Sequence, residues 1–468
     1  MKDKNQYRQL ILFSISTLFV LLQTAIFACI WFHYYNHPNV MIPFYNRGNY
    51  VIIGLYAVMC CLFYKVFGCF RVGYLRVYDT LFTVAAALLC INSVTYLQLC
   101  LICRWSFLQH VGPVIMMTML DAGLVLIWVL FSRWVYVKMS PPRDLLVIYG
   151  EYSPDGLMRK LSSRPDKYHI MEVISIDSDM ELIKEKMKQC GGVVMTDIHS
   201  EVRNNLLKYC FANDIRCYSV PKISDIMIMN ASTINLFDTA LLLFRNNGIP
   251  IGQRFVKRVF DIVVSLIGII VASPFMLIIA ILIKCYDGGP VFFTQNRLTL
   301  NGRVFKIIKF RSMRVQKEQT EYCMTRKNDD RITPVGKILR NIHFDELPQL
   351  FNILKGDMSI VGPRPECPDL AAKYEQIVPE FGFRLKVKAG LTGYAQVYGK
   401  YNTTPYDKLK LDLTYIKKYS FWMDLKLIFM TVKILFQKEN TEGIESWQTT
   451  AATRDNLEKL GKEVGTPK

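Results

Sequence analysis

Two adjacent carboxylates, Asp345 and Glu346, are the residues of this sequence best suited to catalysis. They interrupt Val335–Lys355, a stretch in which apolar residues recur at helical spacing and which we predict to be a helix. Adjacent helical residues point about 100° apart, because an α-helix has about 3.6 residues per turn. One carboxylate can therefore attack an electrophile while the other binds a metal ion or handles a proton. The alternative is that the pair is simply solvated on an exposed face. For two adjacent acidic residues without any further signal, this alternative would be favoured.

Basic residues are frequent in the sequence around this pair, and they favour phosphate chemistry. Phosphoryl transfer depends mainly on positioning and on neutralisation of phosphate charge, often with Mg²⁺. Arginine binds phosphate oxygens through two parallel hydrogen bonds, and carboxylates with water suit Mg²⁺. Asp345 and Glu346 are thus candidate Mg²⁺ ligands as well as candidate catalytic residues. The candidate phosphate-binding residues are Lys309, Arg311, Arg340, Arg364 and Lys400.

A turn rich in glycine and proline follows the acidic pair and reads GDMSIVGPRPE over residues 356–366. Pro363 and Pro365 restrict the backbone on either side of Arg364, because the proline ring fixes φ. We predict a rigid loop that presents this arginine. The residues expected to build the loop are Asp357, Gly362, Pro363, Pro365 and Glu366.

Four apolar runs at the start of the chain are each about long enough to cross a bilayer as a helix. They are residues 10–32, 51–67, 81–102 and 114–131. Lysines and arginines cluster before the first run, between the second and third, and after the fourth, which places both ends of the group in the cytoplasm. We predict a four-helix transmembrane domain over 1–140. Asp121 lies inside the fourth run, and we interpret it as bonding a neighbouring helix or lying in a shallow, wet position rather than as a functional site.

The overall composition restricts the choice of partners. Hydrophobic residues make up 51% of the chain and the formal net charge is +18, which fits lipid head groups, nucleic acid or phosphorylated substrates. Zinc-finger spacing and RNA-binding signatures are absent, so nucleic acid is not expected as a partner. The 13 cysteines show no spacing typical of a metal site or a disulfide framework.

A strand-helix rhythm follows Pro141 and Pro142 and predicts a small parallel sheet covered by helices over 141–245. The expected strands are 145–149, 171–176, 192–195 and 215–220, and the expected helices are 155–162, 180–188 and 201–212. The first turn, from Gly150 to Gly156, lacks the G-x-G-x-x-G pattern of a dinucleotide site. We therefore expect a Rossmann-like cytosolic domain with a regulatory or structural role.

A fifth apolar run, Val259–Ile283, contains Ser273-Pro274 near its middle, where proline must kink or break a helix. Either it spans the membrane or it enters one leaflet and returns. Basic residues flank both ends, which favours a re-entrant helix over 255–285. We predict an α+β catalytic domain over 246–438, including a helix at 426–436 that lies on the membrane or in the core, and a polar tail over 439–468.

The stretch 254–438 resembles the bacterial sugar transferases, the monotopic polyprenyl phosphate glycosylphosphotransferases. The matching blocks are KRVFDIVVSLIGIIVASP (257–274), GGPVFFTQNR (288–297), FKIIKFRSM (305–313), FDELPQLFNILKGDMSIVGPRPE (344–366) and AGLTGYAQVYGK (389–400). Together with the four helices and the Rossmann-like domain, the whole chain resembles the large members that start exopolysaccharide, capsule or O-antigen synthesis. It departs from the family at two positions: family members often have proline where this chain has Ala389, and arginine where it has Lys400. Lysine keeps the charge but loses the planar fork of arginine, which puts the detailed nucleotide contact expected at 400 in doubt.

The resemblance implies a ping-pong reaction at the bacterial inner membrane, with the catalytic domain in the cytoplasm. Asp345 would attack the sugar-bound phosphate of a UDP-sugar, with glucose or galactose as the leading choices, and UMP would leave. Undecaprenyl phosphate would then take the phosphosugar from Asp345, and Glu346 would assist with Mg²⁺ or with the acceptor. Ser273-Pro274 matches the helix break of the family's re-entrant helix, and Arg340 and Arg364 match residues for phosphate binding and site structure. A homodimer is compatible with the resemblance.

Three other functions are less consistent with the sequence. A membrane-anchored nucleotide-sugar dehydratase or epimerase needs a Tyr-x-x-x-Lys pair, for which Tyr406 and Lys410 have the spacing, but it also needs the missing glycine turn. An inactive scaffold of polysaccharide assembly is disfavoured by the intact acidic pair and the 356–366 turn. A transporter is disfavoured because the apolar runs show no inverted repeat.

Overall fold

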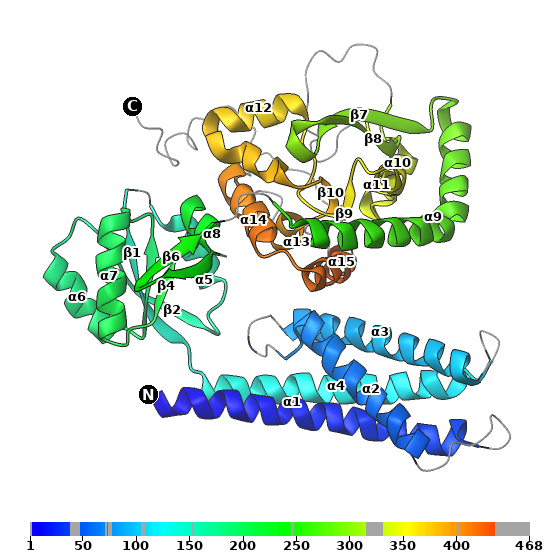
Figure 1. Ribbon diagram of the computed structural model, residues 1–468, viewed down its shortest axis with the longest axis horizontal. Helices are drawn as coiled ribbons and strands as arrows, with labels where there is room; N and C mark the ends of the chain where they lie inside the picture. Colours follow the sequence, from blue (N-terminus) through cyan, green and yellow to red (C-terminus); the bar gives the residue numbers. More distant parts are fainter. Residues whose placement is uncertain are drawn as a thin grey trace. The chain divides into compact units, whose positions relative to one another are not determined.

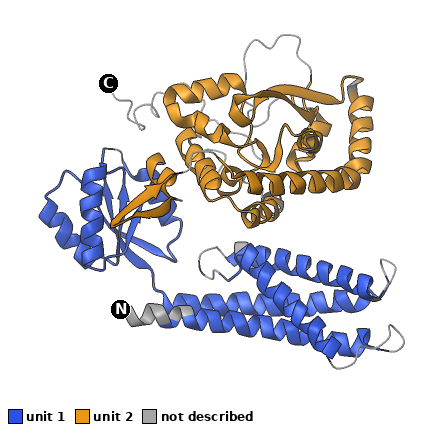
Figure 2. Ribbon diagram, in the orientation of Figure 1, with its two compact units in different colours: residues 1–220 blue, residues 221–468 orange. Residues whose placement is uncertain are grey.

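The computed structural model places the described residues in two compact units, 1–220 and 221–468 (Figure 2). The described residues are 2–37, 47–70, 73, 77–103, 109–151, 153–229, 231–244, 248–314, 331–399 and 403–435. The boundary at residue 220 falls inside the stretch 141–245 that the sequence assigns to one domain. Lys400 and the tail 439–468 lie outside the described residues.

Four long helices open the first unit (Figure 1). They are α1 (Lys2–Ile30), which continues as a π-helical turn η1 (Trp31–Tyr35), α2 (Arg47–Phe67), α3 (Val77–Cys103) and α4 (Gly112–Met139). Each is long and apolar enough to cross a membrane. Helix α1 packs against α2 and α4, and α3 packs against the same two helices.

Asp121 lies on α4 and is fully buried between these helices. Its Oδ2 atom accepts hydrogen bonds from Asn92 Nδ2 on α3 at 3.3 Å and from the Tyr56 hydroxyl on α2 at 3.4 Å. Asn92 Nδ2 also donates to Thr118 Oγ1 at 3.0 Å. Asp121 thus bonds two neighbouring helices, as the structural interpretation of this residue expects.

A four-stranded parallel sheet follows in the same unit, with strand order β2-β1-β3-β4. The strands are β1 (Arg143–Tyr149), β2 (Tyr168–Ser175), β3 (Gly192–Thr196) and β4 (Cys217–Ser219), and the helices are α5 (Asp155–Ser162), α6 (Met180–Gln189) and α7 (Ser200–Ala212). Alternate residues of β1 enter two different apolar clusters, Leu146 with Ile148 and Leu145 with Val147, so both faces of the sheet are covered. The predicted parallel sheet and its strand-helix order are confirmed.

The first turn of this sheet is closed by the protein itself. A Cβ atom on Gly150 would lie 2.0 Å from the carbonyl oxygen of Asp197, so glycine is required there for two backbone segments to approach. In a dinucleotide site the glycines instead let the backbone approach a pyrophosphate. The geometry of Gly150 therefore serves the packing of β1 against the end of β3.

The second unit mixes short strands and helices around a large apolar core and a second, smaller apolar cluster. Its first elements are α8 (Ile223–Ile228), β5 (Ser232–Leu236), β6 (Thr239–Leu243), α9 (Ile251–Asp287), β7 (Phe292–Leu298), η2 (Leu300–Gly302) and β8 (Val304–Phe310). There follow α10 (Pro334–Asn341), η3 (Phe344–Glu346), α11 (Gln349–Lys355), β9 (Ser359–Val361), α12 (Pro368–Ile377), η4 (Pro379–Lys386), β10 (Gly390–Thr392), α13 (Tyr394–Tyr398), α14 (Pro405–Lys417) and α15 (Phe421–Leu435). Strands β5-β6 and β7-β8 pair antiparallel, and β9-β10 pair parallel.

Helix α9 contains Pro274 and bends sharply along its length (Figure 1). Before the proline, Lys257 Nζ forms a buried ion pair with Asp424 at 2.6 Å, and Asp261 Oδ1 accepts from Ser359 Oγ at 3.0 Å. After it, Ile279 and Ile283 pack on Phe310 and Leu339. A straight helix of 37 residues would be about 55 Å long. Because of the bend, both ends of α9 pack on the same unit.

The single helix predicted over Val335–Lys355 is wrong. Helix α10 ends at Asn341, His343 adopts a left-handed conformation with φ of 58°, and α11 begins at Gln349. His343 itself breaks the helix, because a left-handed residue cannot continue a right-handed helix, and Pro348 follows as the N-cap of α11. The apolar periodicity on either side belongs to two short helices, and the acidic pair lies in the 3₁₀ turn between them.

Candidate active site

Asp345 and Glu346 lie in η3, where β8 and the 356–366 loop bring cations toward them. Glu346 Oε1 accepts hydrogen bonds from Lys309 Nζ at 2.6 Å and from Arg364 Nη2 at 3.1 Å. Lys309 comes from β8 and Arg364 from the loop after β9, so three separate segments meet at one carboxylate oxygen. The structure thus brings together three of the predicted site residues.

Asp345 is held differently. It is 8% exposed, and among the described residues its carboxylate has no hydrogen bond or ion pair. Burial raises the pKa of Asp345 and the adjacent charge of Glu346 raises it further, although Lys309, Arg340 and His343 act in the opposite direction. A buried carboxylate without a partner and with cations nearby is suited to attack an anionic phosphate.

Glu346 stays ionised for the opposite reason. Burial alone would raise its pKa, but the charges of Lys309 and Arg364 outweigh burial and hold the pKa well below its usual range. The environments therefore push the pKa values of these neighbours apart, which is typical of carboxylate pairs with divided roles. Their different surroundings agree with separate tasks for the two residues.

The loop that carries Arg364 is fixed through its carbonyl groups. Two of the four residues 363–366 are prolines, which have no amide hydrogen to donate. All four carbonyl oxygens from Pro363 to Glu366 accept a hydrogen bond. The donors, in chain order, are Gly390 N at 2.9 Å, Arg384 Nη2 at 3.0 Å, Arg297 Nη1 at 3.1 Å and Leu298 N at 2.9 Å. The backbone is thus held on both sides of Arg364.

Glu366 lies at the end of this loop in a buried network of charges. Its Oε1 atom pairs with Lys408 and with Arg384 Nη1, the latter at 3.4 Å. Arg384 also forms an ion pair with Asp412 Oδ2 at 2.7 Å. Burial would raise the pKa of Glu366, but the two cations more than offset it and lower the pKa to about 2.

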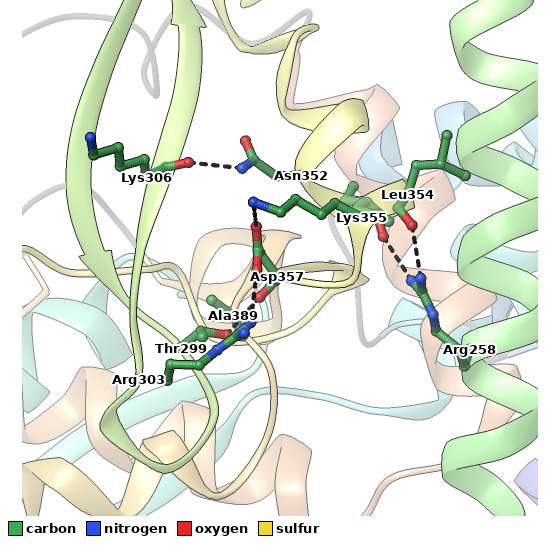
Figure 3. A network of polar contacts seen from close by, with 10 residues as sticks. Arg258, Thr299, Arg303, Lys306, Asn352, Leu354, Lys355, Asp357 and Ala389 are labelled. Carbon is green, nitrogen blue, oxygen red and sulfur yellow. Dashed lines mark hydrogen bonds and ion pairs between the residues drawn. The ribbon is translucent and has the colours of Figure 1, made fainter.

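The start of the loop is held by a second polar network (Figure 3). Thr299 Oγ1 donates to the carbonyl oxygen of Asp357 at 2.8 Å, and Arg303 Nη2 forms an ion pair with its Oδ1 atom at 2.8 Å. Arg258 of α9 donates to the carbonyl oxygen of Leu354 at 2.8 Å and so caps the end of α11. Gly362 is also constrained, because a Cβ atom there would lie 2.4 Å from the carbonyl oxygen of Lys388. Asp357 and Gly362 therefore shape the loop from within.

The remaining predicted residues lie around this centre. Arg340 is near the end of α10 and contributes positive charge at Asp345. The guanidinium of Arg311 packs against the backbone of Gly289 after α9. Ser273 precedes the proline of α9, and its hydroxyl donates to the carbonyl oxygen of Ile270 at 2.8 Å. Lys400, the remaining predicted phosphate-binding residue, lies outside the described residues.

Comparison with known proteins places these features in a family. The family model described as "Bacterial sugar transferase" matches residues 252–438. The UDP-N-acetylgalactosamine-undecaprenyl-phosphate N-acetylgalactosaminephosphotransferase of Aeromonas hydrophila is 32% identical over 322 residues, which cover 67% of this chain and 71% of that protein. The chain belongs to the bacterial sugar transferase family. Its members in this comparison are named as phosphotransferases, and this sugar transferase is an enzyme of that class.

Two other relatives match the sugar transferase over a shorter stretch. The UDP-glucose:undecaprenyl-phosphate glucose-1-phosphate transferase of Klebsiella pneumoniae is 37% identical, with 51% of each chain covered. The undecaprenyl-phosphate galactose phosphotransferase of Salmonella typhimurium is 35% identical, with 47% of this chain and 49% of that protein covered. The chain thus matches about half the length of these two proteins. The three relatives carry three different sugars in their names.

Sequence reasoning missed the residues that hold the loop of this sugar transferase, above all Arg384, Lys408 and Asp412. They lie 18 to 46 positions beyond Glu366, so no local spacing connects them to the loop. A charged side chain between apolar neighbours was the available signal, since Asp412 stands between Leu411 and Leu413 on α14. Tyr406 and Lys410 of the rival hypothesis lie on the same helix, where Lys410 Nζ rests 4.3 Å from the centre of the Tyr406 ring.

Proposed function

We propose that the enzyme transfers a hexose 1-phosphate from a UDP-sugar to undecaprenyl phosphate, giving undecaprenyl-diphosphate-sugar and UMP. The observation that carries this proposal is the arrangement at η3, where Asp345 has no partner among the described residues while Glu346 is clamped by Lys309 and Arg364. The names of the relatives support undecaprenyl phosphate as acceptor and a UDP-sugar as donor.

In the first half of the reaction, a carboxylate oxygen of Asp345 attacks the phosphorus atom bonded to the sugar. A bond from that oxygen to phosphorus forms, the bond from phosphorus to the bridging oxygen of UMP breaks, and UMP leaves with the electron pair. Lys309 and Arg364 lie within hydrogen-bond distance of the neighbouring Glu346 and neutralise charge that develops on the phosphate oxygens. A covalent phosphosugar then remains on Asp345.

In the second half, a phosphate oxygen of undecaprenyl phosphate attacks the same phosphorus atom. The bond to Asp345 breaks, the carboxylate is regenerated, and the sugar leaves as a diphosphate. A ping-pong reaction of this kind needs one enzyme nucleophile and two successive phosphate groups, UMP and undecaprenyl phosphate. The same cations neutralise the phosphate charge in both halves. The single unpartnered carboxylate of the pair supports Asp345 as that nucleophile.

The proposal includes Mg²⁺ as cofactor. Mg²⁺ is usually held by one or two carboxylates together with substrate phosphates and water, and Asp345 with the second oxygen of Glu346 fits this donor set. Among the described residues no group of three or more acidic, histidine or cysteine side chains gathers, so the donor's phosphates would complete the site. When bound, the ion supplies neutralisation of the diphosphate charge.

We also propose that α9 enters the cytoplasmic leaflet of a bacterial inner membrane and returns, with the catalytic unit in the cytoplasm. The bend at Pro274 and the packing of both ends of α9 on one unit support this topology. A spanning helix would carry its two ends to opposite faces of the bilayer. Nucleotide sugars are cytoplasmic, so a cytoplasmic site also meets the needs of the donor.

The proposed role is the first membrane step of exopolysaccharide, capsule or O-antigen synthesis, with glucose or galactose as the leading donors. Because one relative is named for N-acetylgalactosamine, UDP-N-acetylgalactosamine belongs in any donor panel. A homodimer is part of the proposal on family resemblance, and mass measurement in detergent micelles tests it.

Release of UMP from a panel of UDP-sugars, with undecaprenyl phosphate and Mg²⁺, tests the proposed function. We expect one donor to give UMP, and Asp345→Asn to abolish both turnover and the covalent phosphosugar adduct. Thermal unfolding of the variant serves as the control for folding. If well-folded enzyme releases no UMP from any donor, the transferase proposal fails, and normal activity of Asp345→Asn would overturn the nucleophile assignment.

A further inference from the structure

The second half of α9 and helix α10 border an apolar cleft of about 380 Å³. Ile279 and Leu339 are buried within the same apolar cluster at its base, while the other side chains line the sides. Volumes of about 300–1,000 Å³ are typical of sites for small molecules. The lining residues are Phe275, Ile278, Ile279, Leu282, Val335, Ile338, Leu339, Ile342 and Phe344.

One end of this cleft lies at the candidate nucleophile. Phe344 lines the cleft and is followed in the chain by Asp345. Its ring packs edge-to-face on that of Phe275, with ring centres 6.4 Å apart. Phe275 in turn directly follows Pro274, so the bend of α9 brings the second wall of the cleft to the acidic pair. The helix break thus joins an apolar surface to a charged reaction centre.

The sides of the cleft are exposed although every residue lining it is apolar. Ile338 of α10 is 64% exposed and Ile342, directly after α10, is 42% exposed, and Phe275, Ile278 and Leu282 are exposed on α9. The most apolar window of α9 has a mean hydropathy of 2.9 and is only 11% buried. Exposed apolar surface of this extent marks a site for a membrane, a ligand or a partner.

We propose that this cleft binds the first isoprene units of the acceptor, the polyprenyl phosphate. The inference rests on the proposed function, because it assigns the chain of the acceptor used in the second half-reaction. That acceptor is an apolar chain that ends in one phosphate, and the phosphate must reach the phosphorus atom carried by Asp345. The chain therefore has to begin beside Asp345 on a surface that accepts hydrocarbon. Phe344 begins such a surface, while Lys309 and Arg364 provide the charge that the phosphate needs.

The cleft distinguishes this occupant from two others. An acyl chain of bulk phospholipid would fit the apolar lining, but nothing in its chemistry requires it to end beside the nucleophile. A second copy of the chain seated on α10 would cover Ile338 and Ile342 and block the approach to Asp345. The adjacency of Phe344 and Asp345 thus favours the acceptor.

The test uses Ile338→Ser and Ile342→Ser in the full-length enzyme, with undecaprenyl phosphate varied as a mole fraction of detergent micelles. Both side chains are exposed, so the fold should tolerate the change. We expect the KM for the acceptor to rise about ten-fold, because each variant removes apolar contact with the chain. Formation of the phosphosugar adduct from UDP-sugar alone should stay at the wild-type rate. Val271→Ser is the matched control, since Val271 is an exposed residue of α9 that does not line the cleft.

The two half-reactions separate failure of this inference from failure of the proposed function. An acceptor KM within two-fold of wild type in both cleft variants would overturn the inference and assign the cleft to bulk lipid. Equal loss in adduct formation and acceptor transfer would also overturn it, because the cleft would then support the nucleophile alone. Recovery of acceptor affinity only on dilution of protein would assign the cleft to a second copy. If wild-type enzyme forms no adduct and releases no UMP, the proposed function itself fails.

Discussion

Glu366→Gln removes a negative charge that two cations share beneath the Arg364 loop. Glutamine has nearly the same shape and can still accept a hydrogen bond from Arg384. It cannot balance the charge of Lys408, which pairs with Glu366 alone among the described acidic residues. Arg384 keeps its second ion pair with Asp412 at 2.7 Å, so the network is weakened rather than dissolved.

The size of the effect follows from the pKa of Glu366. Its folded-state pKa is about 2, against an ordinary value of 4.5. Since one pKa unit corresponds to about 1.4 kcal/mol, the ionised carboxylate stabilises the folded protein by roughly 3 kcal/mol. Glutamine retains part of the hydrogen bonding, so we expect the variant to lose about 2–3 kcal/mol near neutral pH. In a unit of this size that loss lowers the melting temperature by roughly 5–10 °C.

The pH dependence has a definite sign. A carboxylate with a lowered pKa binds fewer protons in the folded state than in the unfolded state, so its stabilising contribution is fully present above the unfolded pKa. The contribution falls as the pH drops from 4.5 toward about 2. The gap between wild type and Glu366→Gln should therefore be constant from pH 8 to pH 5 and should narrow below pH 4.5.

Activity should fall together with stability. Arg384 donates to the carbonyl oxygen of Arg364, so a displaced Arg384 loosens the loop that presents this arginine to Glu346. A displacement of about 1 Å at a reacting centre can cost on the order of 100-fold, and we expect UMP release to drop by about 10- to 100-fold.

Thermal unfolding in detergent over pH 3–8, with UMP release at pH 7.5, measures both effects. Glu375→Gln is the matched control, because Glu375 is exposed on α12 and its replacement should change neither quantity. A stability gap that persists unchanged at pH 3 would refute the charge argument. Full activity with a lowered melting temperature would show that the network stabilises the fold without positioning Arg364.

Three further outcomes are expected. Lys309→Met leaves Glu346 with one cation instead of two, so it should destabilise the enzyme by about 2 kcal/mol and slow UMP release. Lys309→Arg should retain most of the stability and most of the activity. Equal behaviour of the two variants would contradict the ion-pair role. Asp121→Asn keeps an oxygen that accepts the present hydrogen bonds, so the free energy of unfolding, followed through the melting temperature, should change by no more than about 1 kcal/mol. A large loss of stability would indicate that the charge is required. Lys257→Met leaves the buried Asp424 without its ion-pair partner and should lower the free energy of unfolding by on the order of 3 kcal/mol, measured by thermal unfolding. The double variant with Asp424→Leu should recover part of that loss. Additive losses would count against the ion pair.

Several features of this enzyme could be read from the sequence alone because they depend on local patterns. The four apolar runs and the strand-helix rhythm after residue 142 are properties of consecutive residues, and both correspond to elements of the structure. Five sequence blocks in order between residues 257 and 400 indicated the sugar transferase family, which the comparisons confirm. The proline in the fifth apolar run predicted a kinked helix, and α9, which contains Pro274, bends along its length.

Only the tertiary structure decided how those pieces act together. Lys309, Glu346 and Arg364 come from three segments, and their meeting at one oxygen depends on how β8 and the loop after β9 pack around η3. The helix predicted through Asp345 failed because apolar spacing is the same for one long helix and for two short helices separated by a turn. Likewise, burial and the charge of distant residues set the different surroundings of Asp345 and Glu346. Neither is a property of the adjacent pair itself, so the contrast between the two carboxylates appears only once the chain is folded.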